Sequence, residues 1–86
     1  IKAALVTGAG ARIGRAVALG LAGWGWAVAV HHHRSDEAAK ATVRDIERHG
    51  GHAAALPADL TDEVQVESLV TRSAAALGMP ITCVVN

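Results

Sequence analysis

Residues 5–17, with the sequence LVTGAGARIGRAV, decide the fold. This stretch begins as a short apolar strand, passes through a glycine-rich turn and continues with the apolar spacing of a helix. Glycine lets a backbone come close to a bound group, and the first N–H groups and the dipole of a helix favour an anion. A strand, a turn and a helix in this order therefore predict a phosphate-binding turn for a dinucleotide.

The spacing of the glycines narrows the type of turn. The common fingerprint G-x-G-x-x-G fails, because after Gly8 and Gly10 it needs a glycine at Ile13, and Gly14 comes one position late. The stretch fits T-G-x-x-x-B-x-G instead, with Arg12 as the basic residue. This pattern resembles the short-chain dehydrogenase/reductase family, which usually has glycine in place of Arg12, and it looks most like the family's pteridine-reductase branch. A guanidinium there can reach a phosphate that glycine cannot.

Composition and charge narrow the class of protein further. The 86 residues are 51% hydrophobic, with eight Lys and Arg against eight Asp and Glu, which predicts one globular unit. A neutral chain lacks the basic stripe that nucleic-acid binding needs, and no apolar run is long enough for a membrane helix. We therefore expect a cytoplasmic protein with neither nucleic acid nor membrane as a partner. Cys83 falls in an apolar strand and is expected to be a small buried hydrophobe.

Apolar periodicity predicts alternating strands and helices. Strands are expected at 3–7, 26–32, 52–56 and 81–85, and helices at 12–24, 37–49 and 62–77. Right-handed crossovers then give a parallel sheet of strand order 3-2-1-4, which is half of a doubly wound, Rossmann-type α/β fold. The stripes expected to face the sheet are Ile13, Ala16, Val17, Gly20, Leu21 and Trp24 in the first helix, Ala39, Thr42, Val43 and Ile46 in the second, and Val66, Leu69, Val70, Ser73, Ala74 and Leu77 in the third.

The composition changes abruptly at the end of the second expected strand, where residues 31–36 read HHHRSD. Ligands of open parallel sheets lie beyond the carboxyl ends of the strands, and Arg34 follows Gly14 by 20 residues, where the ribose-reading residue belongs. An acid there would bind a ribose 2′-hydroxyl and repel a 2′-phosphate. Arg34 and Ser35 offer a phosphate forked N–H donors and a hydroxyl, and Arg12 approaches from the same side. This predicts NADP(H) rather than NAD(H).

The family resemblance adds roles for the histidines. In the pteridine-reductase branch an H-x-H-R-S run holds the 2′-phosphate, and His31, His33, Arg34 and Ser35 match it. The resemblance implies this role for His33, Arg34 and Ser35. A metal site is disfavoured, because His32 would point away from His31 and His33 on a strand and no further ligand is evident. Polar residues that merely end a strand stay an alternative for His31 and His32.

The residues that follow the other three expected strands are further candidates for the cofactor site. The resemblance places the turn residues Gly8, Arg12, Ile13 and Gly14 against the cofactor. The family's D-L or D-V pair contacts adenine, which implies this role for Asp59 and Leu60, although Asp59 could equally hold its own loop through backbone hydrogen bonds. Asn86 matches the first asparagine of the family's N-N-A-G and could steady the strand end or contact the adenosine side.

The chemistry expected of the segment is cofactor binding without catalysis. Family members use a serine and a Tyr-x-x-x-Lys pair, yet no tyrosine occurs here, so no catalytic residue is expected within residues 1–86. We expect the N-terminal part of a single NADP(H)-binding Rossmann domain, truncated at both ends. The resemblance implies a homo-oligomeric oxidoreductase, dimer or tetramer, that transfers hydride between NADPH and a small carbonyl or pterin-type C=N substrate. The alternative is a non-catalytic NADP(H)-sensing protein, and a flavin or S-adenosylmethionine site is disfavoured because both usually have an acid where Arg34 stands.

Overall fold

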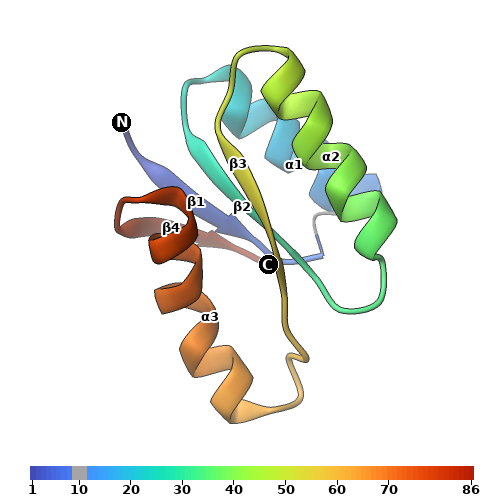
Figure 1. Ribbon diagram of the computed structural model, residues 1–86, viewed down its shortest axis with the longest axis vertical. Coiled ribbons are helices and arrows are strands. Elements are labelled where there is room, and N and C mark those ends of the chain that lie inside the picture. Colours follow the sequence, from blue (N-terminus) through green and yellow to red (C-terminus); the bar gives the residue numbers. More distant parts are fainter. Residues whose placement is uncertain (9–11) are drawn as a thin grey trace.

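The computed structural model describes residues 1–8 and 12–86 as a parallel sheet with helices on both faces (Figure 1). The elements in chain order are β1 (Ala3–Val6), α1 (Arg12–Gly23), β2 (Ala27–His32), α2 (Asp36–Arg48), β3 (Ala53–Pro57), α3 (Glu63–Leu77) and β4 (Ile81–Val85). The strand order is β3-β2-β1-β4. The predicted fold is confirmed, and each element boundary lies within one residue of its predicted position.

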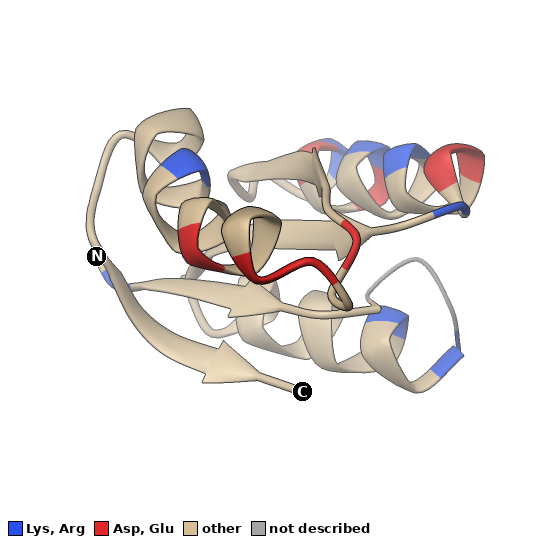
Figure 2. Cartoon of the chain, turned by 90° about the horizontal axis from the view of Figure 1, so that it is seen from below, with Lys and Arg blue, Asp and Glu red and all other residues tan. Residues whose placement is uncertain are grey.

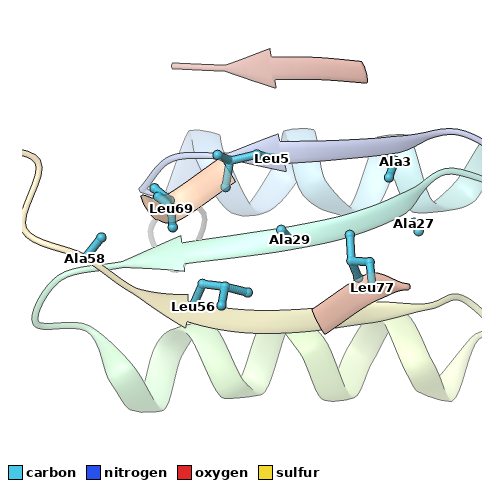
Figure 3. Packing of buried hydrophobic residues seen from close by; sticks show 8 residues of the cluster. All are labelled: Ala3, Leu5, Ala27, Ala29, Leu56, Ala58, Leu69 and Leu77. Atoms are coloured by element: carbon cyan, nitrogen blue, oxygen red, sulfur yellow. The ribbon is translucent and has the colours of Figure 1, made fainter. Parts of the chain in front are cut away.

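The core forms two apolar layers, because successive residues of a strand point to opposite faces of the sheet. Leu5 and Ala29 face α3, and Figure 3 shows them in one cluster with Leu56, Leu69 and Leu77. The neighbouring strand residues face α1 and α2, where the buried cluster consists of Val6, Ala18, Val28, Val30, Ala39, Ile46 and Ala53. Every residue of β1 and β2 is buried, as expected of central parallel strands.

Helix α1 turns a different face to the sheet from the predicted one. Ala18 is its buried residue, while Ile13 is 82% exposed, Trp24 is 86% exposed, and Ala16 and Gly20 are also exposed. The prediction was right only for Val17 and Leu21, which pack partly against the core.

The polar contacts of α1 explain why it turns this face, and not the predicted one, to the sheet. The helix is apolar on most sides, so apolar spacing alone does not select one face. Its Arg15 reaches across to α2, where it pairs with Asp45 and donates a hydrogen bond of 3.1 Å to the Thr42 hydroxyl. These contacts fix the side of α1 that faces α2, and the small side chain of Ala18 then lies against the sheet.

The predicted buried stripes of α2 and α3 agree better with the structure than that of α1. In α2, Ala39, Thr42 and Ile46 are buried and Val43 is half-buried, as predicted. In α3, the residues that reach the core are Leu69, Ser73 and Leu77. Val66 and Val70 of α3 are 41% and 42% exposed, contrary to the prediction, because its apolar face is wider than the part that these strands cover.

The helix ends follow the local chemistry of the sequence. Asp62 caps α3 by accepting a hydrogen bond of 3.0 Å from the Val64 N–H, and Gly78 ends that helix with a left-handed φ of 74°. Gly25 and Gly50, after α1 and α2, have φ of 90° and 84°, a conformation that favours glycine. None of the helices in the described ranges has the length and apolarity to cross a membrane.

Candidate functional site

The candidate site lies at the carboxyl ends of the strands. Parallel pairing aligns Val6 with Val30 and Val85, and His32 with Pro57, so the loops that follow the strands emerge at one edge. In Figure 2 the arrowheads of the strands point toward the side where charged loop segments, red and blue, gather. The structure therefore brings the turn after β1, the tail of β2, the loop after β3 and the end of β4 to the same edge.

Gly8 opens the turn after β1. Its φ of +65° lies in the left-handed region, and, its chain neighbours aside, no atom of the described residues lies within 4 Å of where a Cβ would stand. Its N–H donates a hydrogen bond of 3.0 Å to Nδ1 of His31. Gly8 therefore offers a ligand open space above its Cα, while its own N–H is already used within the protein. Gly10, the second glycine of the turn, lies outside the described residues.

Residues Arg12, Ile13 and Gly14 form the first turn of α1. Arg12 and Ile13 are exposed, and Gly14 is half-buried. Arg12 makes no hydrogen bond or ion pair with any other described residue, so its guanidinium is open to a ligand. The positive end of the α1 dipole lies at the same place and favours an anion there. No contact between Arg12 and the tail of β2 is seen in the described ranges.

The tail of β2 presents donors at the start of α2 that have no hydrogen-bond partner among the described residues. His33, Arg34 and Ser35 are all exposed. Ser35 occupies the N-cap position of α2, yet its hydroxyl makes no capping hydrogen bond. Arg34 also has no hydrogen bond or ion pair within residues 1–8 and 12–86. A forked cation and a hydroxyl on successive residues therefore lack a partner among the described residues, next to the first N–H groups of a helix.

Asp59 first holds its own loop. Its Oδ1 accepts hydrogen bonds from the backbone N–H of Thr61 at 2.9 Å and from the Thr61 hydroxyl at 2.7 Å. These bonds, with smaller contributions from the nearby charges of His33 and Arg34, hold the pKa of Asp59 below its ordinary value. The loop-holding alternative is thus confirmed. Oδ2 lies 3.9 Å from Nε2 of His33, and Leu60 beside it is 44% exposed. Contact of either residue with adenine stays a prediction.

Asn86 steadies the end of β4 against β1. Its Oδ1 lies 3.0 Å from the hydroxyl of Thr7, and that hydroxyl is also 3.2 Å from the carbonyl oxygen of Val85. The Thr7 N–H donates to the same carbonyl at 2.9 Å. The first of the two roles expected of Asn86 is therefore present, and its contact with the cofactor stays a prediction.

The two buried histidines of the β2 tail point to opposite faces, as predicted. His31, 3% exposed, contacts the turn after β1 and the loop after β3. His32, 7% exposed, has its Nε2 3.5 Å from Asp36 on α2, and its buried Nδ1 has no partner among the described residues. Sequence reasoning gave His31 no site role, although its place in the H-x-H-R-S run was the available signal.

The fold and this edge define a nucleotide-binding α/β unit, with a glycine turn after the first strand and polar loops at the carboxyl ends. Residues 2–86 match the sequence model of the family described as short chain dehydrogenase. The chain therefore belongs to the short-chain dehydrogenase/reductase family.

Individual relatives agree with this assignment. Elsinochrome reductase 1 of Elsinoe fawcettii is 43% identical over 77 residues, which are 90% of this chain and 29% of that relative. A short-chain dehydrogenase of Burkholderia cenocepacia, solved with NADP, is 44% identical with a TM-score of 0.92, covering 99% of this chain and 34% of that one. The FolM alternative dihydrofolate reductase 1 of Brucella canis, also solved with NADP, is 36% identical with a TM-score of 0.88, covering 96% and 32%. The chain thus spans about a third of the length of these proteins.

Proposed function

We propose that this chain is the NADP(H)-binding part of a short-chain oxidoreductase, with residues 1–86 forming the N-terminal part of a single domain. The observation that carries the proposal is the pair Arg34 and Ser35, which stand exposed, without a partner among the described residues, where an acid would select NAD(H). The NADP in the Burkholderia and Brucella structures supports it.

In this proposal each loop at the carboxyl edge contacts a different part of the cofactor. Arg34 and Ser35 hold the 2′-phosphate with the N-terminus of α2, and His33 lies beside them. Arg12 approaches the same 2′-phosphate from the first turn of α1, and Ile13 and Gly14 face the pyrophosphate beside the open space at Gly8. The remaining contacts, from the loop after β3 and the end of β4, come from Asp59, Leu60 and Asn86.

The bound cofactor would supply the hydride, and this chain would hold the cofactor in place. The Tyr-x-x-x-Lys pair expected to move the proton in this family is not among residues 1–86, since the chain has no tyrosine. Reduction of a small carbonyl or pterin-type C=N substrate, by a cytoplasmic homo-oligomer, is the whole-protein activity that we propose.

The test is titration of the full-length protein with NADPH and NADH, for the wild type and for Arg34→Asp. We expect the wild type to prefer NADPH and the variant to lose roughly ten- to a hundredfold in NADPH affinity, because it loses a charge-assisted contact and gains a repulsion. Arg44→Asp is the matched control, because Arg44 is an exposed arginine of α2 without an ion pair to a described residue. A wild type that prefers NADH, or an Arg34→Asp variant that keeps the wild-type preference, would contradict the proposal.

A further inference from the structure

The geometry of His31 points to a positioning role: its ring ties the turn after β1 to the loop after β3, and so sets the spacing between two parts of the cofactor site. This inference rests on the proposed function. His31 is 3% exposed. Its Nδ1 lies 3.0 Å from the N–H nitrogen of Gly8, and its Nε2 lies 2.9 Å from the carbonyl oxygen of Ala58.

These two partners fix the protonation of the ring. The Gly8 N–H can only donate, so Nδ1 must be the bare nitrogen that accepts. The carbonyl of Ala58 can only accept, so Nε2 must carry the hydrogen. One neutral tautomer satisfies both partners, whereas a second proton on Nδ1 would point at the N–H of Gly8.

The place of His31 in the sheet explains why it can make both contacts. β2 lies between β1 and β3, so a side chain at its carboxyl end can reach the loops of both neighbours. The partners are 23 and 27 residues away in sequence. A backbone hydrogen bond of 3.0 Å from the Ala58 N–H to the carbonyl of His32 adds a second tether to the same loop.

The tethered residues adjoin the proposed cofactor contacts on both sides. Gly8 opens the space for the pyrophosphate, and Ala58 directly precedes Asp59, the proposed adenine contact. A site whose loops are already oriented binds its ligand with a smaller entropic cost. The ring therefore presets the distance between the pyrophosphate side and the adenine side before the cofactor arrives.

Two substitutions separate the two tethers in the full-length protein. In His31→Asn the side-chain oxygen stands where Nδ1 stands and can accept from Gly8, but nothing reaches Ala58. In His31→Gln the amide nitrogen reaches the place of Nε2 and can donate to Ala58, but nothing accepts from Gly8. The probes are NADPH and adenosine 2′-monophosphate, which has the adenine and the 2′-phosphate but no pyrophosphate.

We expect the two variants to differ in their affinity for adenosine 2′-monophosphate. His31→Asn frees the loop after β3 and should lose about three- to tenfold in affinity for both nucleotides, as for one hydrogen bond. His31→Gln frees only the turn after β1 and should lose a similar factor for NADPH while keeping the wild-type affinity for adenosine 2′-monophosphate. His52→Asn, which removes a histidine contact of 3.1 Å to the carbonyl of Leu77 at the opposite edge, should change neither affinity.

Other outcomes overturn the inference. Unchanged affinities in both variants, or equal losses for both nucleotides in both variants, would mean that the ring does not set the spacing. A wild type that binds neither nucleotide would overturn the proposed function as well, so the two failures are distinguishable. If the variants do not fold, the ¹⁵N chemical shifts of the His31 ring in the wild type decide: we expect a bare Nδ1 and a protonated Nε2, and the opposite tautomer or a charged ring would overturn the inference.

Discussion

The two edges of the sheet differ in what their polar groups do. At the amino edge a hollow of about 350 Å³ lies between α1 and α2, lined mainly by apolar residues such as Leu19, Ala22 and Ile46. Its polar members already have partners: Asp45 is bound by Arg15 and Arg48, and the contact at His49 is made with the backbone of Asp45. At the carboxyl edge the guanidinium groups of Arg12 and Arg34 and the hydroxyl of Ser35 are left without partners among the described residues.

This difference shows that a hollow in the surface and a set of polar groups able to bind a ligand need not occur at the same place. Glycines with positive φ occur at both edges, and a Cβ added at Gly8, Gly25 or Gly50 would meet open space; Gly25 and Gly50 end helices, whereas Gly8 lies beside polar loops. A ligand site needs a few convergent polar groups that the protein itself does not satisfy, and an apolar hollow alone does not supply them. We therefore expect substitutions at the amino edge to change stability and those at the carboxyl edge to change cofactor affinity.

The largest effect on stability is expected from Ile46→Ala at the amino edge. Ile46 is 2% exposed and packs in the layer between the sheet and the two helices. Removing its side chain leaves a cavity, which should lower the free energy of unfolding by about 2–5 kcal/mol. Denaturant unfolding of the full-length protein measures this loss. The ratio of NADPH to NADH affinity should stay that of the wild type, and a changed ratio would contradict the separation of the two edges.

A smaller effect is expected from Gly51→Ala at the same edge. An added Cβ would lie 2.6 Å from Cγ2 of Ile46 and 3.1 Å from its carbonyl oxygen. This overpacking should cost about 1–3 kcal/mol of the free energy of unfolding. Gly20→Ala is the matched control, because no atom of the described residues outside its own helix backbone lies within 4 Å of the added Cβ, and alanine in a helix interior is favoured by about 0.5–1 kcal/mol over glycine.

A double variant identifies the cause of that cost. Ile46→Leu removes the Cγ2 atom that the new methyl group would strike. Combined with Gly51→Ala, it should be less destabilised than the sum of the two single variants, since neighbouring substitutions that share a clash are not additive. Strictly additive losses would show that the clash with Ile46 is not the reason.

The same comparison shows which features the sequence could predict. The helix ends at Gly25, Gly50 and Gly78 are set by local chemistry and were predicted, and the strand order followed from the right-handed crossovers between successive strands. The buried face of α1 was not, because a helix that is apolar on most sides is oriented by a tertiary contact, here between Arg15 and Asp45. His31 was missed for the same reason, since both of its partners are distant in sequence. Asp59 was predicted in part, because its bonds to Thr61 are local.

The smallest expected effects come from Asp45 and Asp59, one carboxyl at each edge. Hydrogen bonding lowers the pKa of both from the ordinary value of 3.8, mainly through Arg15 for Asp45 and mainly through Thr61 for Asp59. A carboxyl whose pKa is lower in the folded state stabilises the protein when ionised. This stabilisation is complete above the ordinary value and is lost as pH falls through the lowered one. Asp45→Asn and Asp59→Asn should each make unfolding less steeply dependent on pH in that acid range.

Cofactor affinity should distinguish these two carboxyls at neutral pH. Asp45→Asn should bind NADPH as the wild type does. If Asp59 accepts from the exocyclic amine of adenine, as we propose, Asp59→Asn puts an amide nitrogen in place of the accepting oxygen, and we expect a loss of about three- to tenfold in NADPH affinity. The same variant should bind the hypoxanthine analogue of NADPH better than the wild type does, because that base offers an oxygen acceptor in place of the amine. If both variants bound both cofactors like the wild type, Asp59 would serve its loop alone, and adenine recognition at this edge would have to come from Leu60 and its backbone.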